Sequence, residues 1–177
     1  SNSGQSHIRV AEIKGIGDVL VGPMARVNVN GGYGSELADT ELEELKAQWG
    51  FPFKRVMLGH AARILEMIHA WEKIMGLLEA PPGEGLRVTA TPVEGEGTGV
   101  VEAPEGLLVY GLRVDGDGLV KGLSITAPLQ FNIGSLERCL LEGACKAGAG
   151  AEGEARAPVL LETVARSYAP CIPCALH

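Results

Sequence analysis

The chain has 177 residues, of which 46% are hydrophobic and 21% are charged, and its formal net charge is -7. This composition is typical of a folded globular protein and excludes a disordered one. The negative charge disfavours nucleic acid as a partner, because phosphate binding favours a clustered basic face. No stretch approaches the roughly 20 apolar residues of a membrane span, and residues 1–5 show no signal-peptide pattern. We therefore expect a cytoplasmic protein, at most peripheral on a membrane complex.

The first fifty residues combine glycine-rich turns with one helix. Residues 8–29 mix short apolar runs with glycines and predict one or two short extended segments, and residues 31–34 predict a loop. Thr40 followed by Glu43 fits a capping box, with apolar residues at helical spacing behind it. Gly50 predicts the end of that helix.

The clearest helix runs from about Phe53 to Leu78, where apolar residues recur with a period of about 3.6 residues. His60, Arg63 and Glu66 follow one another at intervals of three residues and can share one flank of this helix. Such a row is more typical of a surface or inter-helix pairing than of a catalytic set.

The middle of the chain predicts an antiparallel sheet. Residues 80–85 form a loop or a domain boundary, because they are rich in proline and glycine. Residues 86–93 and 107–114 are candidate strands. The Asp-Gly-Asp-Gly sequence at 115–118 predicts a hairpin turn that leads into a return strand at 119–126.

The last third of the chain predicts helices again. Residues 133–146 indicate a short helix, and residues 147–157 indicate a mobile loop because they are small and glycine-rich. Pro158 suits the first turn of a further helix that reaches about Tyr168.

These elements together predict an α+β fold in which long helices pack beside a small antiparallel sheet. Residues 1–79 would be the helical portion, and residues 86–177 would hold the sheet, the last helix and a carboxy-terminal tail. We expect the two portions to form one compact unit.

The chain ends in a pair of cysteines, Cys171 and Cys174, followed by His177. Two thiolates at i and i+3 can bind one metal ion, and thiolates are soft donors that suit nickel, iron, zinc and copper(I). Pro170 and Pro173 restrict the backbone around them. A C-x-x-C pair on its own is also compatible with half a zinc site, a redox pair or a disulfide.

Four stretches, in the same order, resemble the large subunit of nickel–iron hydrogenases. Residues 169–177, A-P-C-I-P-C-A-L-H, are similar to the D-P-C-x-x-C-x-x-H end of that family. The other three, G-P-M-A-R-V-N at 22–28, A-R-x-x-E at 62–66 and E-A-P-E-G at 102–106, are similar to the family's G-P-L-A-R-x-N, A-R-x-x-E and E-A-P-R-G. The chain thus looks like the carboxy-terminal part of such a subunit.

The resemblance implies a nickel–iron centre held by four cysteines. Cys171 would be a terminal nickel ligand, Cys174 would bridge nickel and iron, and His177 would bind magnesium or a similar ion. Cys139 and Cys145 do not match the family's amino-terminal C-x-x-C, and small residues packed in a helix are the better interpretation for them. The implied partners are an iron–sulfur small subunit, a chain or missing region with the first cysteine pair, and maturation proteins.

Two positions depart from the family at the implied site. Glu105, directly after Pro104, stands where the family has the arginine of E-A-P-R-G, and Ala169 stands where it has the aspartate of D-P-C. A fixed cation is thereby replaced by a titratable anion, and its acidic partner is lost as well. Glu105 is a candidate proton acceptor, and the two changes equally fit a retired site.

Three functions stay open at this point. The first is hydrogenase chemistry, the reversible oxidation of H2 at a nickel–iron centre, in an assembly without which the isolated chain is inactive. The second is a non-catalytic, hydrogenase-like scaffold or assembly subunit. The third is a small zinc or redox protein, which leaves the other three motifs unexplained.

Overall fold

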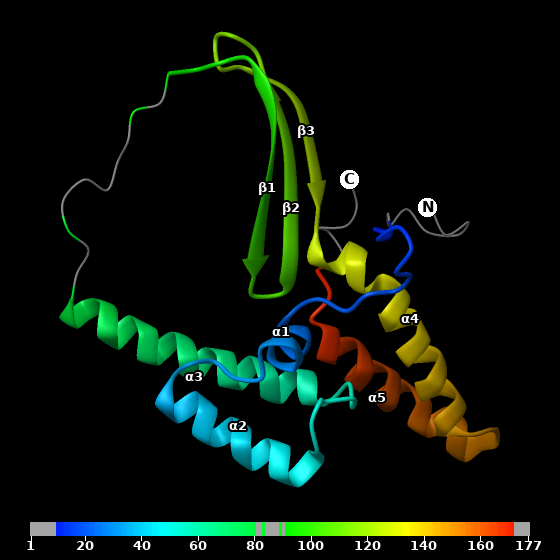
Figure 1. Cartoon of the computed structure of the whole chain (residues 1–177). Coiled ribbons are helices and arrows are strands. Elements are labelled where there is room, and N and C mark those ends of the chain that lie inside the picture. The colour runs from blue at the N-terminus through cyan, green and yellow to red at the C-terminus, as the bar shows by residue number, and fades with distance from the viewer. Residues whose placement is uncertain (1–9, 81–82, 84–88, 90, 172–177) are drawn as a thin grey trace.

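The computed structural model describes residues 10–80, 83, 89 and 91–171. Within these ranges the chain forms five α-helices and one three-stranded sheet. Figure 1 shows the helices gathered at one end of the molecule and the sheet rising from them. This arrangement confirms the predicted α+β fold with long helices beside a small antiparallel sheet. No helix in the described ranges combines the length and hydrophobicity that a membrane crossing requires.

The first helix, α1 (Pro23–Asn30), was expected to be an extended segment, and that prediction is wrong. Proline occupies its first position, where a missing N–H costs nothing, and its fixed φ suits a helix. The helix ends at Gly31, whose φ of 72° is left-handed and whose N–H donates to Val27 O at 2.9 Å. The short helix thus begins and ends on the two residue types best suited to those places.

The second helix, α2 (Glu36–Trp49), begins earlier than the capping box predicted. Thr40 lies inside it, and its hydroxyl donates to Glu36 O at 2.8 Å. The carboxylate of Glu72, from the next helix, accepts hydrogen bonds from the N–H groups of Leu37 and Ala38 at 3.1 and 3.2 Å. The N–H groups of the first turn, which have no partner within the helix, are therefore satisfied by a side chain that is distant in the sequence. The residues around the start of α2 do not reveal such a partner. The predicted end at Gly50 is confirmed.

The third helix, α3 (Leu58–Glu79), confirms the clearest prediction but starts five residues later than expected. Asn28 explains the delay. Its Oδ1 accepts from the N–H of Phe53 at 2.8 Å, and its Nδ2 donates to the carbonyl of the same residue at 2.8 Å. Phe53 is therefore paired with α1 and cannot join the helical ladder.

The sheet consists of β1 (Gly95–Ala103), β2 (Gly106–Val114) and β3 (Val120–Thr126), antiparallel and in that order. The two later strands confirm the prediction, and so does the turn between them, where Asp115 Oδ1 accepts from the N–H groups of Asp117 and Leu119 at 3.1 and 2.9 Å.

The first strand was predicted too early. Residues 91–93 form no strand, and residues 86–88 and 90 of that prediction lie outside the described ranges. The strand that does form has the sequence G-E-G-T-G-V-V-E-A, whose three glycines are poor strand formers. It pairs along its whole length with β2, so cross-strand pairing outweighs its low propensity.

The last two helices are α4 (Pro128–Ala147) and α5 (Gly150–Tyr168). The predicted short helix is therefore a long one, and the predicted mobile loop at 147–157 is wrong, because only two residues connect the helices. Pro158 lies inside α5 rather than in its first turn. At Gly143 the helices pack closely, since a Cβ there would lie 3.5 Å from Leu161 Cδ2. The predicted end at Tyr168 is confirmed.

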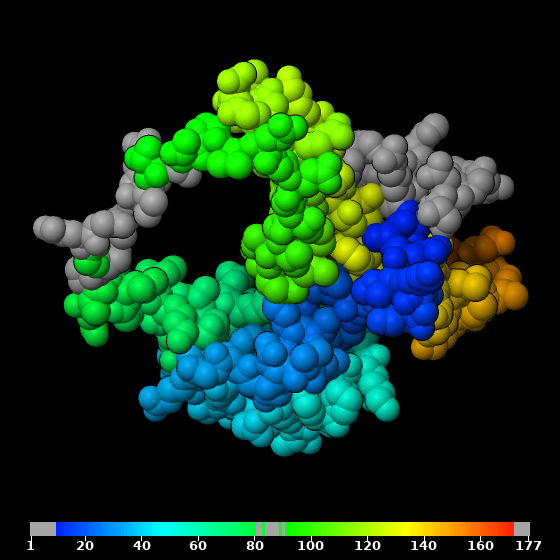
Figure 2. Space-filling model, turned by 45° about the horizontal axis from the view of Figure 1, so that its top comes forward, coloured from blue at the N-terminus to red at the C-terminus, as the bar shows by residue number. Residues whose placement is uncertain are grey.

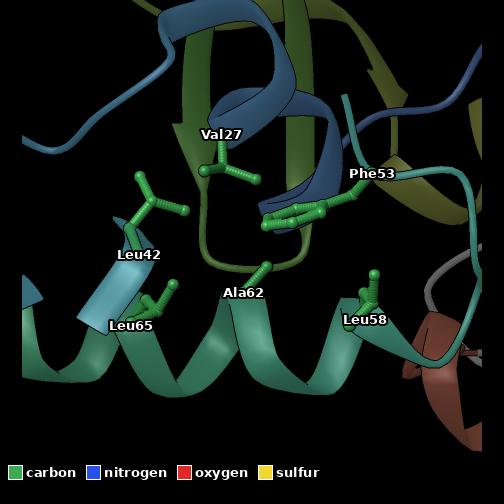
Figure 3. Close-up of a cluster of buried hydrophobic side chains, with 6 residues drawn as sticks. All are labelled: Val27, Leu42, Phe53, Leu58, Ala62 and Leu65. Atoms are coloured by element: carbon green, nitrogen blue, oxygen red, sulfur yellow. The ribbon is translucent and has the colours of Figure 1, made fainter. Parts of the chain in front are cut away.

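Two clusters of buried side chains hold the helices together. The first joins α1, α2 and α3, and Figure 3 shows its side chains converging between these helices: Val27, Leu42, Phe53, Leu58, Ala62 and Leu65. The second joins α4 and α5: Leu129, Ile133, Leu136, Val164 and Tyr168. Each fully buried aliphatic side chain contributes about 1.5–3 kcal/mol. The candidate site lies between the two clusters and the base of the sheet.

Candidate functional site

Arg26 of α1 fixes the turn between β1 and β2 against α3. Its Nε and Nη2 donate to the two carboxylate oxygens of Glu66, both at 2.7 Å. Its Nη1 donates to Glu102 Oε2 at 2.6 Å and to Ala103 O at 2.9 Å, and Nη2 also donates to Pro104 O at 2.9 Å. All five guanidinium N–H donors are engaged in this way. The hydrogen bond with Glu66 is the main cause that raises the pKa of Arg26.

Two glycines let the same turn approach the segment before α1. Gly22 has a φ of 103°, and a Cβ on it would lie 2.6 Å from Glu105 O. Gly106 has a φ of 137°, and a Cβ on it would lie 2.6 Å from Val21 Cγ2. Both conformations suit glycine alone. The motifs at 22–28 and 102–106 therefore meet in space, and each needs its glycine to do so.

Helix α4 also contacts the segment before α1, through Asn132. The side chain of Asn132 accepts from Val21 N at 2.8 Å and donates to Val21 O at 3.1 Å. Asn132 is buried, and these hydrogen bonds satisfy both the oxygen and the nitrogen of its amide group away from water. Sequence analysis gave Arg26 and Asn132 no role. For Arg26 a signal was present, because it lies in the motif at 22–28, although its partners could not be read from the sequence.

The end of α5 is anchored to α3 by Arg63, whose Nη2 donates to Ser167 O at 2.8 Å. The helices approach closely at Gly59, where a Cβ would lie 3.1 Å from the same carbonyl oxygen. The pair is therefore an inter-helix contact, as the row of polar residues on α3 suggested. The chain then turns at Ala169, which has the left-handed φ of 45°.

An apolar cavity of about 500 Å³ lies beside this turn. Its lining includes Cys171 and the two residues that depart from the family pattern, Glu105 and Ala169. The remaining lining comes from the sheet, α4 and the end of α5: Ala103, Leu108, Tyr110, Ile125, Ala127, Pro128, Leu129, Asn132, Tyr168 and Pro170. Cys171 is disulfide-bonded in this structure.

A second, charged cavity of about 690 Å³ lies on the other side of the turn. Ala103, Glu105 and Ala169 line both cavities, so these three residues lie between the two spaces. Its wall includes both guanidinium groups, those of Arg26 and Arg63, and the carboxylate of Glu66. Burial lowers the pKa of Arg63, while the charges of Glu66 and Glu105 act in the opposite direction. Glu105 thus has a cationic neighbour on the side of the charged cavity.

The predicted site residues are brought together in part. Glu105, Ala169 and Cys171 share one cavity, and Pro104 lines the charged one and accepts a hydrogen bond from Arg26. The predicted ligands at positions 174 and 177, including the expected magnesium ligand, lie outside the described ranges. Among the described residues, no group of three or more histidine, cysteine, aspartate or glutamate side chains is placed to hold a metal ion.

The two other cysteines both lie on α4. The sulfur of Cys139 is 3.2 Å from the hydroxyl of Tyr168, in the second buried cluster. Cys145 is exposed, which corrects the expectation that both pack as small buried residues. Both are free thiols. Burial, together with the contact to Cys139, raises the pKa of Tyr168 to about 12.

Comparison with known proteins identifies hydrogenases. No protein-family model matches the chain. It is 33% identical over 162 residues to sulfhydrogenase 2 subunit alpha of Pyrococcus furiosus, and the match covers 90% of the chain and 38% of that protein. It is 31% identical over 168 residues to the subunit beta of the NAD-reducing hydrogenase HoxS of Cupriavidus necator, covering 91% of the chain and 34% of that protein.

Solved structures agree with these relatives. The chain is similar to a crystal structure of an NAD+-reducing NiFe hydrogenase in the H2-reduced state, with a TM-score of 0.79 and 26% identity, over 93% of this chain and 37% of that one. It is also similar to the NiFeSe hydrogenase of Desulfovibrio vulgaris Hildenborough, with a TM-score of 0.67 and 27% identity, over 97% of this chain and 38% of that one.

Fold, motifs and relatives together define a hydrogenase large-subunit fold. The chain belongs to the nickel–iron hydrogenase large-subunit family and corresponds to its carboxy-terminal part. It spans a little over a third of the length of the two curated relatives.

Proposed function

We propose that the chain is one part of a hydrogenase large subunit and takes part in the reversible oxidation of H2 at a nickel–iron centre. The observation that carries this proposal is the position of Cys171 on the wall of an apolar cavity, beside Glu105 and Ala169. Thiolate is a soft donor that suits nickel and iron. A cavity of about 500 Å³ leaves room for a metal centre and a small gas.

The donor set within the described ranges fits such a centre only in part. Cys171 supplies one thiolate, and Cys174, outside those ranges, is the second in sequence. The remaining donors would come from a region outside this sequence, either a separate chain or a missing amino-terminal region, since the match covers only 38% and 34% of the relatives. Because Cys171 is disulfide-bonded here, its thiolate can bind a metal only after a dithiol reductant has opened that disulfide and been oxidised to a disulfide itself.

A bound nickel–iron centre would supply the cleavage of H2 into protons and electrons. The residues of this chain would then manage the proton. Glu105 faces both cavities, so its carboxylate can accept a proton on the apolar side and release it on the charged side. Arg63 is a cationic neighbour of this carboxylate. The partners in this proposal are a chain with the first cysteine pair, an iron–sulfur small subunit and maturation proteins, all in the cytoplasm.

Metal analysis tests the proposal. We expect nickel and iron, each near one per chain, in protein purified without oxygen from its host, and less than a tenth of that in Cys171→Ser. Cys145→Ser is the matched control, because its thiol is exposed and lies outside both cavities. Zinc alone, or equal metal content in wild type and Cys171→Ser, would rule out the nickel–iron centre.

A second candidate is a non-catalytic, hydrogenase-like scaffold. One observation favours it: the two departures from the family pattern, Glu105 and Ala169, line the same two cavities. Paired losses at one site are what a retired centre would show. A chain that purifies with its partner subunits but with neither nickel nor iron would establish this second function over the first.

A further inference from the structure

A histidine that the proposed function does not use lies on the wall of the charged cavity. His69 of α3 lines this cavity together with Glu66 and Glu105. Its Nδ1 is 2.8 Å from the hydroxyl oxygen of Ser35, the residue directly before α2. Within the described part of the chain Nε2 has no hydrogen-bond partner, and no buried side-chain nitrogen or oxygen there lacks one. Nε2 is therefore accessible to solvent.

Neighbouring side chains fix the orientation of this ring. The ring of Tyr33 packs against it, with centroids 5.8 Å apart and planes tilted by 33°. Tyr33 is itself held in place, because its hydroxyl donates to Ala62 O at 3.3 Å and its N–H donates to Asp39 Oδ1 at 2.6 Å. These contacts keep Nδ1 of His69 toward the start of α2. Because the two nitrogens of an imidazole point in different directions, Nε2 is turned away from it.

Glu72 decides which ring nitrogen carries the proton. Its carboxylate accepts from the N–H of Leu37 at 3.1 Å at the start of α2. This N–H is the main cause that lowers the pKa of Glu72, and a hydrogen bond from the Ser35 hydroxyl contributes. An ionised carboxylate only accepts, so the Ser35 proton points to Glu72 and the Ser35 oxygen accepts from His69. Nδ1 then carries the proton, and Nε2 is a base.

Water can connect this base with Glu105. The charge of Glu105 acts on Arg63, and His69 lies six residues, or about 9 Å, farther along α3 than Arg63. The cavity between them measures about 690 Å³, which is room for several water molecules. It lies where the base of the sheet meets α1 and α3, and Figure 2 shows open space above α3 beside the base of the sheet. A proton can cross this space through water.

The charged groups around the ring favour the arrival of a proton. The cavity wall carries three carboxylates and two guanidinium groups: Glu66, Glu102, Glu105, Arg26 and Arg63. An excess of carboxylates attracts protons toward the wall. Behind the ring, on the side of α2, the carboxylates of Asp39 and Glu72 accept from backbone N–H groups. Histidine suits a carrier in this place, because it takes up and releases protons near neutral pH.

We propose that Glu72 and Ser35 hold His69 as a proton acceptor, and that His69 carries to bulk water the protons that Glu105 releases into the charged cavity. The carrier role rests on the proposed function. Nε2 takes the proton from the carboxyl group of Glu105 through water, and the imidazolium then gives it to solvent. Glu105 returns to its carboxylate and His69 to its neutral form, so the cycle is balanced. Ser35 and Glu72 are positioning residues.

Nitrogen NMR of the full chain, labelled with 15N, tests the proton acceptor without any metal. The sequence has four histidines, and the signals missing from His69→Asn identify those of His69. At a pH where the ring is neutral, we expect Nδ1 to be protonated and Nε2 to be unprotonated. Ser35→Ala removes the acceptor of the Nδ1 proton and should shift the population toward the Nε2-protonated form. A wild-type ring with its proton on Nε2 would overturn the proposal.

Turnover of the holoenzyme from its host tests the carrier role. His69→Asn should lower the rate of H2 oxidation at least about tenfold without changing the KM for H2, and added imidazole should restore most of the rate. His60→Asn is the matched control, because His60 lies on the same helix but lines neither cavity. It should keep the wild-type rate. An unchanged rate in His69→Asn, or a loss that imidazole does not restore, would refute the carrier role.

Nickel counted in the same samples separates this proposal from the proposed function. A wild-type protein without nickel and without H2 oxidation removes the proposed function and the carrier role with it, while an unprotonated Nε2 still establishes the proton acceptor. Nickel and H2 oxidation together with a protonated Nε2 do the reverse.

Discussion

At the scale of single residues, Arg26 and Arg63 show how differently two half-buried guanidinium groups are used. Every N–H donor of Arg26 is paired, whereas Arg63 donates to a carbonyl at the end of α5. Saturated pairing is typical of a structural role.

We expect Arg26→Gln to lower the free energy of unfolding by about 1–3 kcal/mol, because it leaves Glu66 and two carbonyl oxygens of the β1–β2 turn without their donors. Urea denaturation measures the change. The control is Arg166→Gln, which removes an exposed pair with Glu162 and should cost less than about 0.5 kcal/mol. Equal effects of the two substitutions would contradict the structural role of Arg26.

Tyr168 makes stability depend on alkaline pH. Its phenol is buried, and burial raises its pKa to about 12, while in the unfolded chain the value is about 10. The group therefore stabilises the fold fully below pH 10, and this contribution is lost as the pH rises through about 12. We expect the unfolding free energy of wild type to fall between pH 10 and 12 by up to about 1.4 kcal/mol per pH unit more than that of Tyr168→Phe.

Urea denaturation of the two proteins at intervals across this pH range measures the difference. Both keep the same lysines and other tyrosines, whose titration cancels in the comparison. Parallel curves for the two proteins would mean that Tyr168 ionises as freely in the folded chain as in the unfolded one.

At the scale of elements, the close contact between the segment before α1 and the β1–β2 turn leaves no room for a larger residue at Gly106. Gly106→Ala should lower the free energy of unfolding by about 2–4 kcal/mol, because it combines a disallowed φ of 137° with a Cβ 2.6 Å from Val21 Cγ2. Gly99→Ala is the control within β1, where a Cβ meets nothing within 4 Å. It should stabilise the strand by up to about 1 kcal/mol.

Thermal and urea unfolding both report these changes. A neutral Gly106→Ala would mean that the sheet does not need its close approach to α1, and that the two motifs meet without constraint.

The elements that the sequence predicts well are those whose determinants are local. The hairpin turn at 115–118 and the end of α2 were predictable, because Asp115 and Gly50 act on their own neighbours. The start of α2 was not predictable, because Glu72 satisfies it from 34 or more residues away. The same holds for β1, whose glycine-rich sequence becomes a strand only through its pairing with β2.

In the candidate site, too, the features set by local sequence were predictable and those set by distant partners were not. Its residue types and their order were visible in the sequence, and the structure places Glu105, Ala169 and Cys171 around one cavity. The joint that positions them was not visible, since it depends on the hydrogen bonds of Arg26 and Asn132 to partners up to 111 residues away.

At the scale of the whole molecule, the chain leaves large apolar residues on its surface. They lie on α3, where Met67 and Trp71 are 71% and 64% exposed, and on the strands, where Val100, Val101 and Leu123 are each 57% or 58% exposed. Exposed apolar surface of this kind is typical of a chain that another protein surface covers. Its two buried clusters are small, and the sheet joins the helices mainly at its base (Figure 1).

Arg26 binds the β1–β2 turn through the main-chain carbonyls of residues 103 and 104 and the carboxylate of Glu102. Gly106 packs closely against Val21 and Gly22. None of these contacts involves the side chain of residue 105. The turn can therefore present arginine, glutamate or another group at the same point in space without rebuilding its support. Evolution can exchange the side chain at this position while the framework around it stays unchanged.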